Sequence, residues 1–201
     1  MNKVSLNEFL KILKQNGLNV ENDEGVDYPP TIGVYHKHDW DCGYESGLGY
    51  NGTRRQFYAD MNQSINFLFD YINHYNLTEG IISPCLKSIF VHNLDKGKEF
   101  NDIYAEIKEL LKENKIDKRT HTGMQFTINQ NEKIIEMIIE GAFRDISNFR
   151  LYFPQNNVLI LPTHHFDLVF HTLNFYCEKE VILRLLKMYP DLKHFEYPPN
   201  E

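Results

Sequence analysis

Two short stretches of the sequence contain residues that could carry out chemistry together. The first holds His36, His38, Asp39, Asp41 and Cys42. Alternate residues of an extended strand point to the same side, so the two histidines could both reach one metal ion. Asp41 would have to bend back toward them. Such an arrangement would suit a metal that activates water for hydrolysis.

A second stretch, in the last third of the chain, contains His165, Asp167 and His171. These three residues would share one face if the stretch formed a strand. Pairing of that strand with the one that carries His36 and His38 would join the two groups into one site. The alternative function that follows is a small metal-dependent hydrolase built on this cluster of His and Asp residues.

The neighbours of the first histidines favour a structural role instead. Ile32, Val34 and Trp40 would share the strand face of these histidines, where packing is more common than metal binding. We therefore predict no cofactor and assign no metal ligand. The chain has no G-x-S-x-G nucleophile motif, and no pair of carboxylates stands out as a general acid and base. The sequence thus favours a protein that is not an enzyme.

Gly47, Gly49 and Gly52 form a G-x-G-x-x-G pattern that resembles a nucleotide-binding loop. In a dinucleotide site, a buried strand leads directly into the first glycine, and an acidic residue ends a second strand about 20 residues later. Polar residues lead into Gly47 here, and the corresponding position lies near Asp70, inside an expected helix. The pattern therefore indicates a flexible turn before that helix.

Length and composition indicate one folded domain spanning residues 1–201. The chain has 42% hydrophobic and 24% charged residues, which is typical of globular proteins. Its formal net charge of -7 argues against nucleic-acid binding, which needs a basic face. No apolar run approaches the roughly 18 residues of a membrane span. The odd number of cysteines fits a reducing compartment, so we expect a cytoplasmic protein. Cys177, in apolar surroundings, is expected to be buried.

Hydrophobic periodicity and capping residues predict the order of the elements. Ser5 and Glu8 form a capping box for a helix that Gly17 ends, within residues 1–20, and residues 21–30 form an acidic loop. Further helices are expected at 54–75, 98–114, 131–145 and 178–188, and strands at 31–40, 88–94, 124–128, 149–153, 158–161 and 165–172. This order predicts a single α+β domain with a mixed or mostly antiparallel sheet packed by about five helices.

Acidic and aromatic residues are interleaved around the strand expected at 31–40. The candidate partner-binding residues are Asp23, Glu24, Asp27, Tyr28, Asp39, Trp40, Asp41, Tyr44 and Glu45. Aromatic anchors among carboxylates suit the capture of a basic protein surface, because aromatic residues dominate binding energy and opposite charges accelerate association. We therefore predict a non-enzymatic binding protein with a basic protein partner, which binds neither nucleic acid nor membranes.

In its size, negative charge, order of elements and abundance of Asn, Lys, Ile and Tyr, the chain resembles the small acidic immunity proteins that bacteria encode beside polymorphic toxins. The segment Asn157 to Asp191 contributes to this resemblance, because it has the strand–strand–helix ending common in such proteins. The resemblance implies that the protein sequesters a toxin by tight binding and has no chemistry of its own.

Overall fold

The computed structural model describes residues 2–18, 30–37, 54–83, 122–143, 149–163 and 165–199, together with isolated helical positions at 105, 109, 112 and 113. The strand expected at 88–94 and most of the helix expected at 98–114 lie outside the described residues. The same is true of the glycine pattern from Gly47 to Gly52 and of most of the acidic loop at 21–30.

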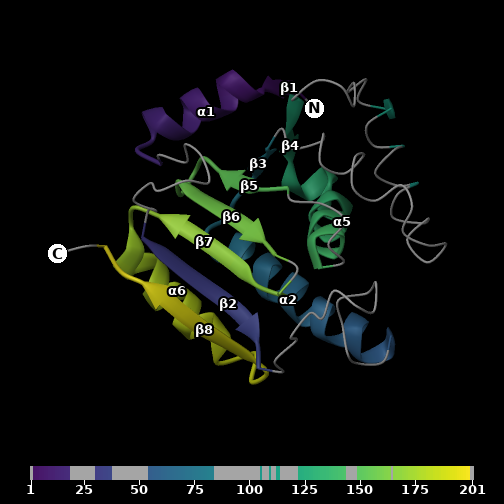
Figure 1. Cartoon of the computed structure of the whole chain (residues 1–201), viewed down its shortest axis with the longest axis vertical. Helices are drawn as coiled ribbons and strands as arrows, with labels where there is room; N and C mark the ends of the chain where they lie inside the picture. The colour runs from purple at the N-terminus through teal and green to yellow at the C-terminus, as the bar shows by residue number, and fades with distance from the viewer. Residues whose placement is uncertain are drawn as a thin grey trace.

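An eight-stranded sheet organises the described part of the chain (Figure 1). Its strands run in the order β1-β4-β3-β5-β6-β7-β2-β8, and every neighbouring pair is antiparallel. The strands are β1 Asn2–Ser5, β2 Thr31–His36, β3 Glu79–Ile82, β4 Thr122–Thr127, β5 Leu151–Phe153, β6 Val158–Pro162, β7 Leu168–Thr172 and β8 Leu192–Tyr197.

Four α-helices complete the described fold, which confirms the α+β class with a mostly antiparallel sheet. They are α1 Leu6–Gln15, α2 Arg54–His74, α5 Glu132–Phe143 and α6 Phe175–Leu186. A short 3-10 helix, Ile128–Gln130, links β4 to α5. None of the described helices is both long and apolar enough to cross a membrane.

The helix α1 begins and ends where its sequence signals place it. The hydroxyl of Ser5 accepts a hydrogen bond from the backbone N–H of Glu8 at 3.2 Å, which satisfies one of the free donors of the first turn. Gly17, just past the helix, has a φ of +76°, a conformation that costs glycine little. The buried residues Phe9 and Leu13 lie four positions apart and therefore on one side of the helix.

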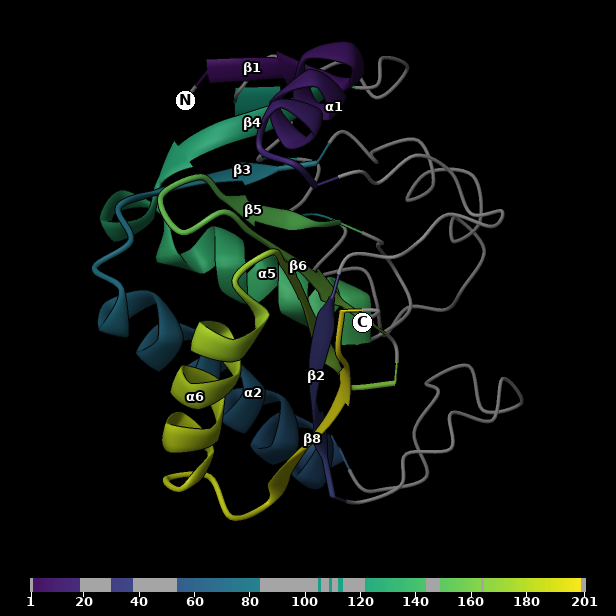
Figure 2. The ribbon, with the colours of Figure 1, turned by 90° about the vertical axis from the view of Figure 1, so that its left-hand side faces the viewer.

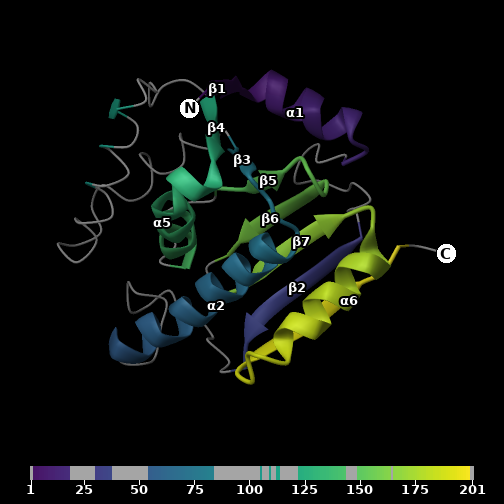
Figure 3. The same ribbon diagram turned by 180° about the vertical axis from the view of Figure 1, so that it is seen from behind.

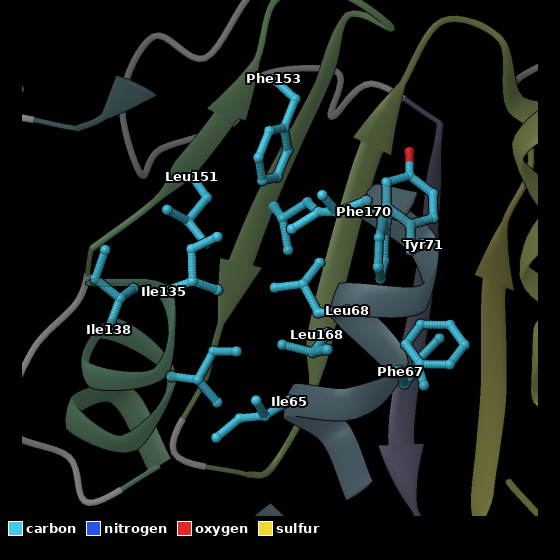
Figure 4. Packing of buried hydrophobic residues seen from close by; sticks show 14 of the residues in the cluster. Ile65, Phe67, Leu68, Tyr71, Ile135, Ile138, Leu151, Phe153, Leu168 and Phe170 are labelled. Carbon is cyan, nitrogen blue, oxygen red and sulfur yellow. The ribbon is translucent and has the colours of Figure 1, made fainter. Parts of the chain in front are cut away.

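Three helices cover one face of the sheet, called here the back face (Figure 3). Their apolar side chains meet alternate residues of the strands in the main core, so that residues such as Ile32, Leu168 and Phe170 are fully buried. Figure 4 shows this packing around Leu68 of α2 and Ile135 of α5. Rings meet edge to face, as between Phe67 and Phe170 at a centroid distance of 6.3 Å. α2, α5 and α6 therefore hold the sheet from behind.

The opposite, front face carries α1 over only part of its width (Figure 2). Phe9 and Leu13 of α1 pack against Ile81, Tyr152 and Leu159, which belong to β3, β5 and β6. This smaller cluster includes the edge-to-face contact of Phe9 with Tyr152 at 6.5 Å. The front faces of β7, β2 and β8 are not part of it.

The turn before β7 departs from the sequence prediction. A strand was expected from His165, but β7 begins at Leu168, because the described residues just before it lie in a turn in which Thr163 N–H donates a 2.9 Å hydrogen bond to the Asp167 carbonyl. Phe166 has a φ of 63° and is fully buried. Its ring packs against that of Phe143, with the two ring centroids 4.5 Å apart. Tertiary packing therefore stabilises a backbone conformation that phenylalanine rarely adopts.

The exposure of Cys177 also differs from the sequence prediction. Because α6 starts at Phe175, three residues before the expected start, Phe175 and Glu178 face the core and Cys177 faces solvent.

A buried polar network joins α2 to α6 behind the sheet. The Tyr71 hydroxyl donates to Glu178 Oε2 at 2.8 Å and accepts from Asn156 Nδ2 at 2.6 Å. Burial and the neighbouring Glu178 raise the pKa of Tyr71, so its hydroxyl keeps its proton and remains a donor. Burial also raises the pKa of Glu178, although the hydrogen bonds from Tyr71 and Tyr75 oppose that shift. The Tyr71 hydroxyl is thus the central group of the network.

We expect Tyr71→Phe to lower the free energy of unfolding by about 1–3 kcal/mol, because it removes the hydroxyl that serves two buried partners. Tyr189→Phe is the matched control. It removes a 2.5 Å hydrogen bond to Asp70, which is only partly buried and can bind water instead. Urea unfolding monitored by circular dichroism measures both variants. Equal losses would contradict the central position of Tyr71.

Candidate protein-binding face

The predicted partner-binding residues from Asp23 to Glu45 all lie outside the described residues. The chain nevertheless connects them directly to one described strand. Tyr28 precedes β2 by a few residues, and Asp39 follows the end of β2 at His36 by a few residues. The environment of β2 is therefore the described structure that bears most closely on the predicted surface.

The strand registers place β2 in the middle of the front face not covered by α1. A row of paired residues crosses this face from Ile81 through Tyr152 and Leu159 to His171, and on to Thr31 and Tyr197. Because side chains alternate along a strand, Gly33 and Tyr35 share this face with Thr31, and Phe195 shares it with Tyr197.

Three aromatic residues form a patch on this part of the sheet. Tyr35 and Phe195 have ring centroids 6.0 Å apart, and Phe195 and Tyr197 are 5.7 Å apart. The first two are half-buried, whereas Tyr197 is 67% exposed. We call Tyr35, Phe195 and Tyr197 the aromatic patch. Aromatic residues at least partly accessible to solvent are common among those that dominate protein interfaces.

The ring of Phe195 packs directly against the backbone of Gly33. A Cβ atom at this position would lie 2.0 Å from Phe195 Cζ and 2.1 Å from Cε1, far inside van der Waals contact. Only glycine therefore allows the ring to lie against β2. This cross-strand pairing of a glycine with an aromatic residue fixes where the patch is centred.

The candidate hydrolase residues are not brought together by the structure. β2 and β7 do pair, but His171 lies opposite Thr31, at the other end of β2 from His36. The two histidines also face opposite sides of the sheet, because His36 is an odd number of positions from Thr31. His38, Asp39, Asp41 and Cys42 lie outside the described residues. Within the part of the chain that is described, no three His, Cys, Asp or Glu side chains are grouped as a metal ion would require.

Two of the described histidines of that hypothesis, His36 and His171, have local partners. His36 Nε2 lies 3.3 Å from Asp60 Oδ1 behind the sheet, and both side chains are buried. His171 Nδ1 lies 2.8 Å from Thr31 Oγ1, within hydrogen-bonding distance. These contacts agree with packing roles for the two residues.

The beginning of β8 is fixed to the end of β2 by charged residues. The ammonium group of Lys37 pairs with Asp191 Oδ1, and Gln63 Nε2 donates to Asp191 Oδ2 at 3.3 Å. The hydrogen bond from Lys37 is the largest cause that lowers the pKa of Asp191. Lys37 N–H also donates to the Asp191 carbonyl at 2.7 Å. These contacts help to hold β8, and with it Phe195 and Tyr197, in place.

Asp167, from the second histidine stretch, has an unusual carboxyl group. Burial raises its pKa to about 6, while nearby His165 and the hydroxyl of Thr163 oppose that shift. Thr163 Oγ1 donates to Asp167 Oδ2 at 3.4 Å, a long hydrogen bond. A raised pKa can mark a functional carboxyl, but here the group sits in a tight turn between β6 and β7 and has a structural explanation.

Acidic and basic residues are nearly balanced in the described part of the chain, although the whole chain has a net charge of -7. Most of the negative charge therefore comes from the other segments, including the two acidic ones that adjoin β2. The described residues add the rings of the aromatic patch beside these segments but little net charge.

The aromatic patch was missed by sequence analysis because β8 was not recognised. The sequence Leu192 to Tyr197 alternates only weakly in hydrophobicity, and its back-face residues include His194 and Glu196. A usable signal was present in Gly33, since a glycine inside a strand often marks the close approach of another group.

No protein-family model, curated protein or solved structure gives a significant match to the chain.

We expect the stability of the protein to reflect the raised pKa of Asp167. Since the folded pKa of about 6 lies above the ordinary aspartate value of 3.8, this group contributes stability below about pH 4 that is lost as the pH rises through 6. Asp167→Asn should therefore raise the free energy of unfolding at pH 8 by about 1–2 kcal/mol and leave it unchanged at pH 4.

Urea unfolding at both pH values measures this effect, and Asp191→Asn is a control with the opposite sign. The pKa of Asp191 is lowered, so its contribution is present at pH 8 and is lost as the pH falls. An Asp167→Asn variant that is less stable than the wild type at pH 8 would show that the carboxylate is favourable in the turn.

We expect Gly33→Ala to displace the Phe195 ring and to lower the free energy of unfolding by about 1–2 kcal/mol, because the added Cβ overlaps the ring. In a Phe195→Ala background the same substitution should cost clearly less. A double-mutant cycle by urea unfolding isolates this coupling. Additive effects of the two substitutions would contradict the contact.

Proposed function

We propose that this chain is a non-enzymatic binding protein that captures a basic protein partner through the front face around β2, in the manner of a bacterial immunity protein. The observation that carries the proposal is the aromatic patch, which lies on a part of the sheet that α1 does not cover. Half-buried and exposed rings of this kind supply contact area at a low cost in conformational entropy.

Charge complements the aromatic patch in this proposal. The acidic segment that ends with Asp27 and Tyr28 runs into β2, and the one that begins with Asp39 leaves it. Arg and Lys side chains of a basic partner would find carboxylates in these segments and aromatic faces on the patch. The same charge would accelerate association at low ionic strength and weaken as salt increases.

The anchoring of the patch also suits a binding role. Phe195 is held against Gly33, and β8 is tied to β2 through Lys37 and Asp191. An aromatic surface that is already ordered loses little freedom when a partner docks, which favours tight binding. This agrees with the sequestering role that the resemblance to immunity proteins implies.

The test is neutralisation of, and binding to, the polypeptide encoded directly beside this chain. Co-expression should rescue growth from that polypeptide, and calorimetry should give a dissociation constant that rises with salt between 50 and 300 mM NaCl. Tyr35→Ala and Tyr197→Ala should each weaken binding at least tenfold, since central aromatic anchors typically contribute more than 1 kcal/mol.

Two further sets of variants distinguish the contribution of the aromatic patch to binding from that of the acidic residues. Met188→Ala, at a residue 59% exposed in the turn after α6, is the control and should bind like the wild type. Charge reversal at Asp23, Glu24, Asp39 and Asp41 should weaken binding mainly at low salt. Binding that none of these substitutions affects would reject the front face as the binding site, and the lack of any complex would reject the immunity-protein form of the proposal.

A further inference from the structure

The strand β8 forms one edge of the sheet (Figure 1). It pairs with β2 on one side, and no described strand pairs with its other side. An edge strand carries backbone N–H and C=O groups that are free to pair with another chain. β8 has six residues with neither proline nor glycine, whereas the opposite edge, β1, has four and runs directly into α1. β8 is therefore the edge better suited to accept a further strand.

We propose that β8 pairs with β8 of a second copy of this chain, antiparallel, about a twofold axis that passes through the sheet at Phe195. This pairing would join the two sheets into one. It is isologous, so both β8 edges become paired and the assembly stops at a dimer. Pro198 and Pro199 follow β8 and, lacking N–H donors, end the ladder at Tyr197.

The charges of β8 select this register. A twofold axis normal to the sheet preserves its faces, so it must pass through a residue pair of like number. An axis at Lys193 would oppose two ammonium groups, and one at Glu196 would oppose two carboxylates. Like charges directly opposite each other destabilise a strand pair.

Axes at Leu192 and Tyr197, the two ends of the strand, would pair only one residue of each copy within β8, so His194 and Phe195 remain as centres. An axis at His194 would oppose the two histidines and set the buried Leu192 against a carboxylate. The axis at Phe195 instead places His194 opposite Glu196 of the partner subunit, twice. It also places Lys193 opposite Tyr197 of the partner subunit, where an ammonium group and a ring can interact. The register centred at Phe195 is therefore the one in which the side chains of β8 complement those of its copy.

The helix α6 adds apolar surface beside the same edge. Lys179 Nζ lies 2.6 Å from Glu196 Oε2, so this side of α6 faces β8. Tyr176 lies three positions before Lys179, on the same side of the helix, and is 67% exposed. Figure 3 shows α6 running alongside the edge strand. A second copy across the twofold axis would bring its own α6 to this side, where Tyr176 offers contact area.

The first test is the molar mass of the purified full-length chain by light scattering over a range of concentrations. The proposal predicts a dimer with twice the 23.8 kDa mass of one chain at tens of micromolar. His194→Glu should raise the dimer dissociation constant about tenfold, because it opposes two carboxylates twice. Adding Glu196→Gln should restore most of the affinity, and Glu132→Lys on α5 should have no effect.

The second test fixes the register by disulfide formation in a background with Cys42, Cys85 and Cys177 replaced by alanine. Directly opposite residues of antiparallel strands have Cα atoms about 4.5–5.5 Å apart, within disulfide range. The double variant H194C/E196C should therefore cross-link into a dimer under oxidation, and H194C alone should not.

The outcomes of the two tests are decisive. A monomeric mass at all concentrations, or a dimer that His194→Glu leaves intact, overturns the proposed pairing. Cross-linking by H194C alone shows an axis at His194 and overturns the proposed register. Circular dichroism of each variant shows whether it is folded, and the exposed positions of His194 and Glu196 make folding the expected result.

Discussion

The register of β2 between β7 and β8 determines which side chains lie on each face of this part of the sheet. Ile32 and Val34 lie opposite Phe170 and Leu168 of β7, all four in the main core. This apolar match behind the sheet fixes the register, and alternation then requires Gly33 and Tyr35 to face the front. A slip by one residue would expose the two aliphatic side chains and bury Tyr35. The aromatic patch thus follows from the packing of the back face.

The two faces of the sheet are covered unequally by the described helices. Sheet width accounts for part of this, since eight strands spaced about 4.8 Å apart span roughly 34 Å. The 10-residue helix α1 is about 15 Å long and cannot cover that width. Its contacts with Ile81, Tyr152 and Leu159 leave the front of β2 and β8 outside its reach. The aromatic patch that the proposed function uses therefore lies outside the contacts of α1, although Thr31 and His171 on the same face are buried.

Local signals in the sequence were sufficient for the elements that carry them. The Ser5 cap and the glycine at position 17 located α1, and a long run of periodic apolar residues located α2. The hairpin of β5 and β6 was recognisable from its apolar strands and polar turn. These features are encoded within a few residues of each other, so they do not depend on the rest of the fold.

The pairing of distant segments could not be obtained in this way. β1 and β3 have only four residues each, and β8 alternates only weakly in hydrophobicity, so none of the three gives a clear strand signal on its own. The separation of His36 from His171 likewise depends on register, which the sequence did not reveal. The aromatic patch could not be predicted from the sequence, because Phe195 and Tyr197 belong to β8, which the sequence analysis did not recognise as a strand.

The two proposals constrain each other through the position of the patch. Phe195 and Tyr197 belong to the edge strand, so a twofold axis at Phe195 would place the aromatic patches of two subunits side by side, with centres about 10 Å apart. A standard protein interface covers about 800 Å² on each partner, roughly 30 Å across. Two globular partners could not occupy both patches at once. A dimer of this kind would therefore bind one partner across its axis, or it would dissociate as each subunit binds its own.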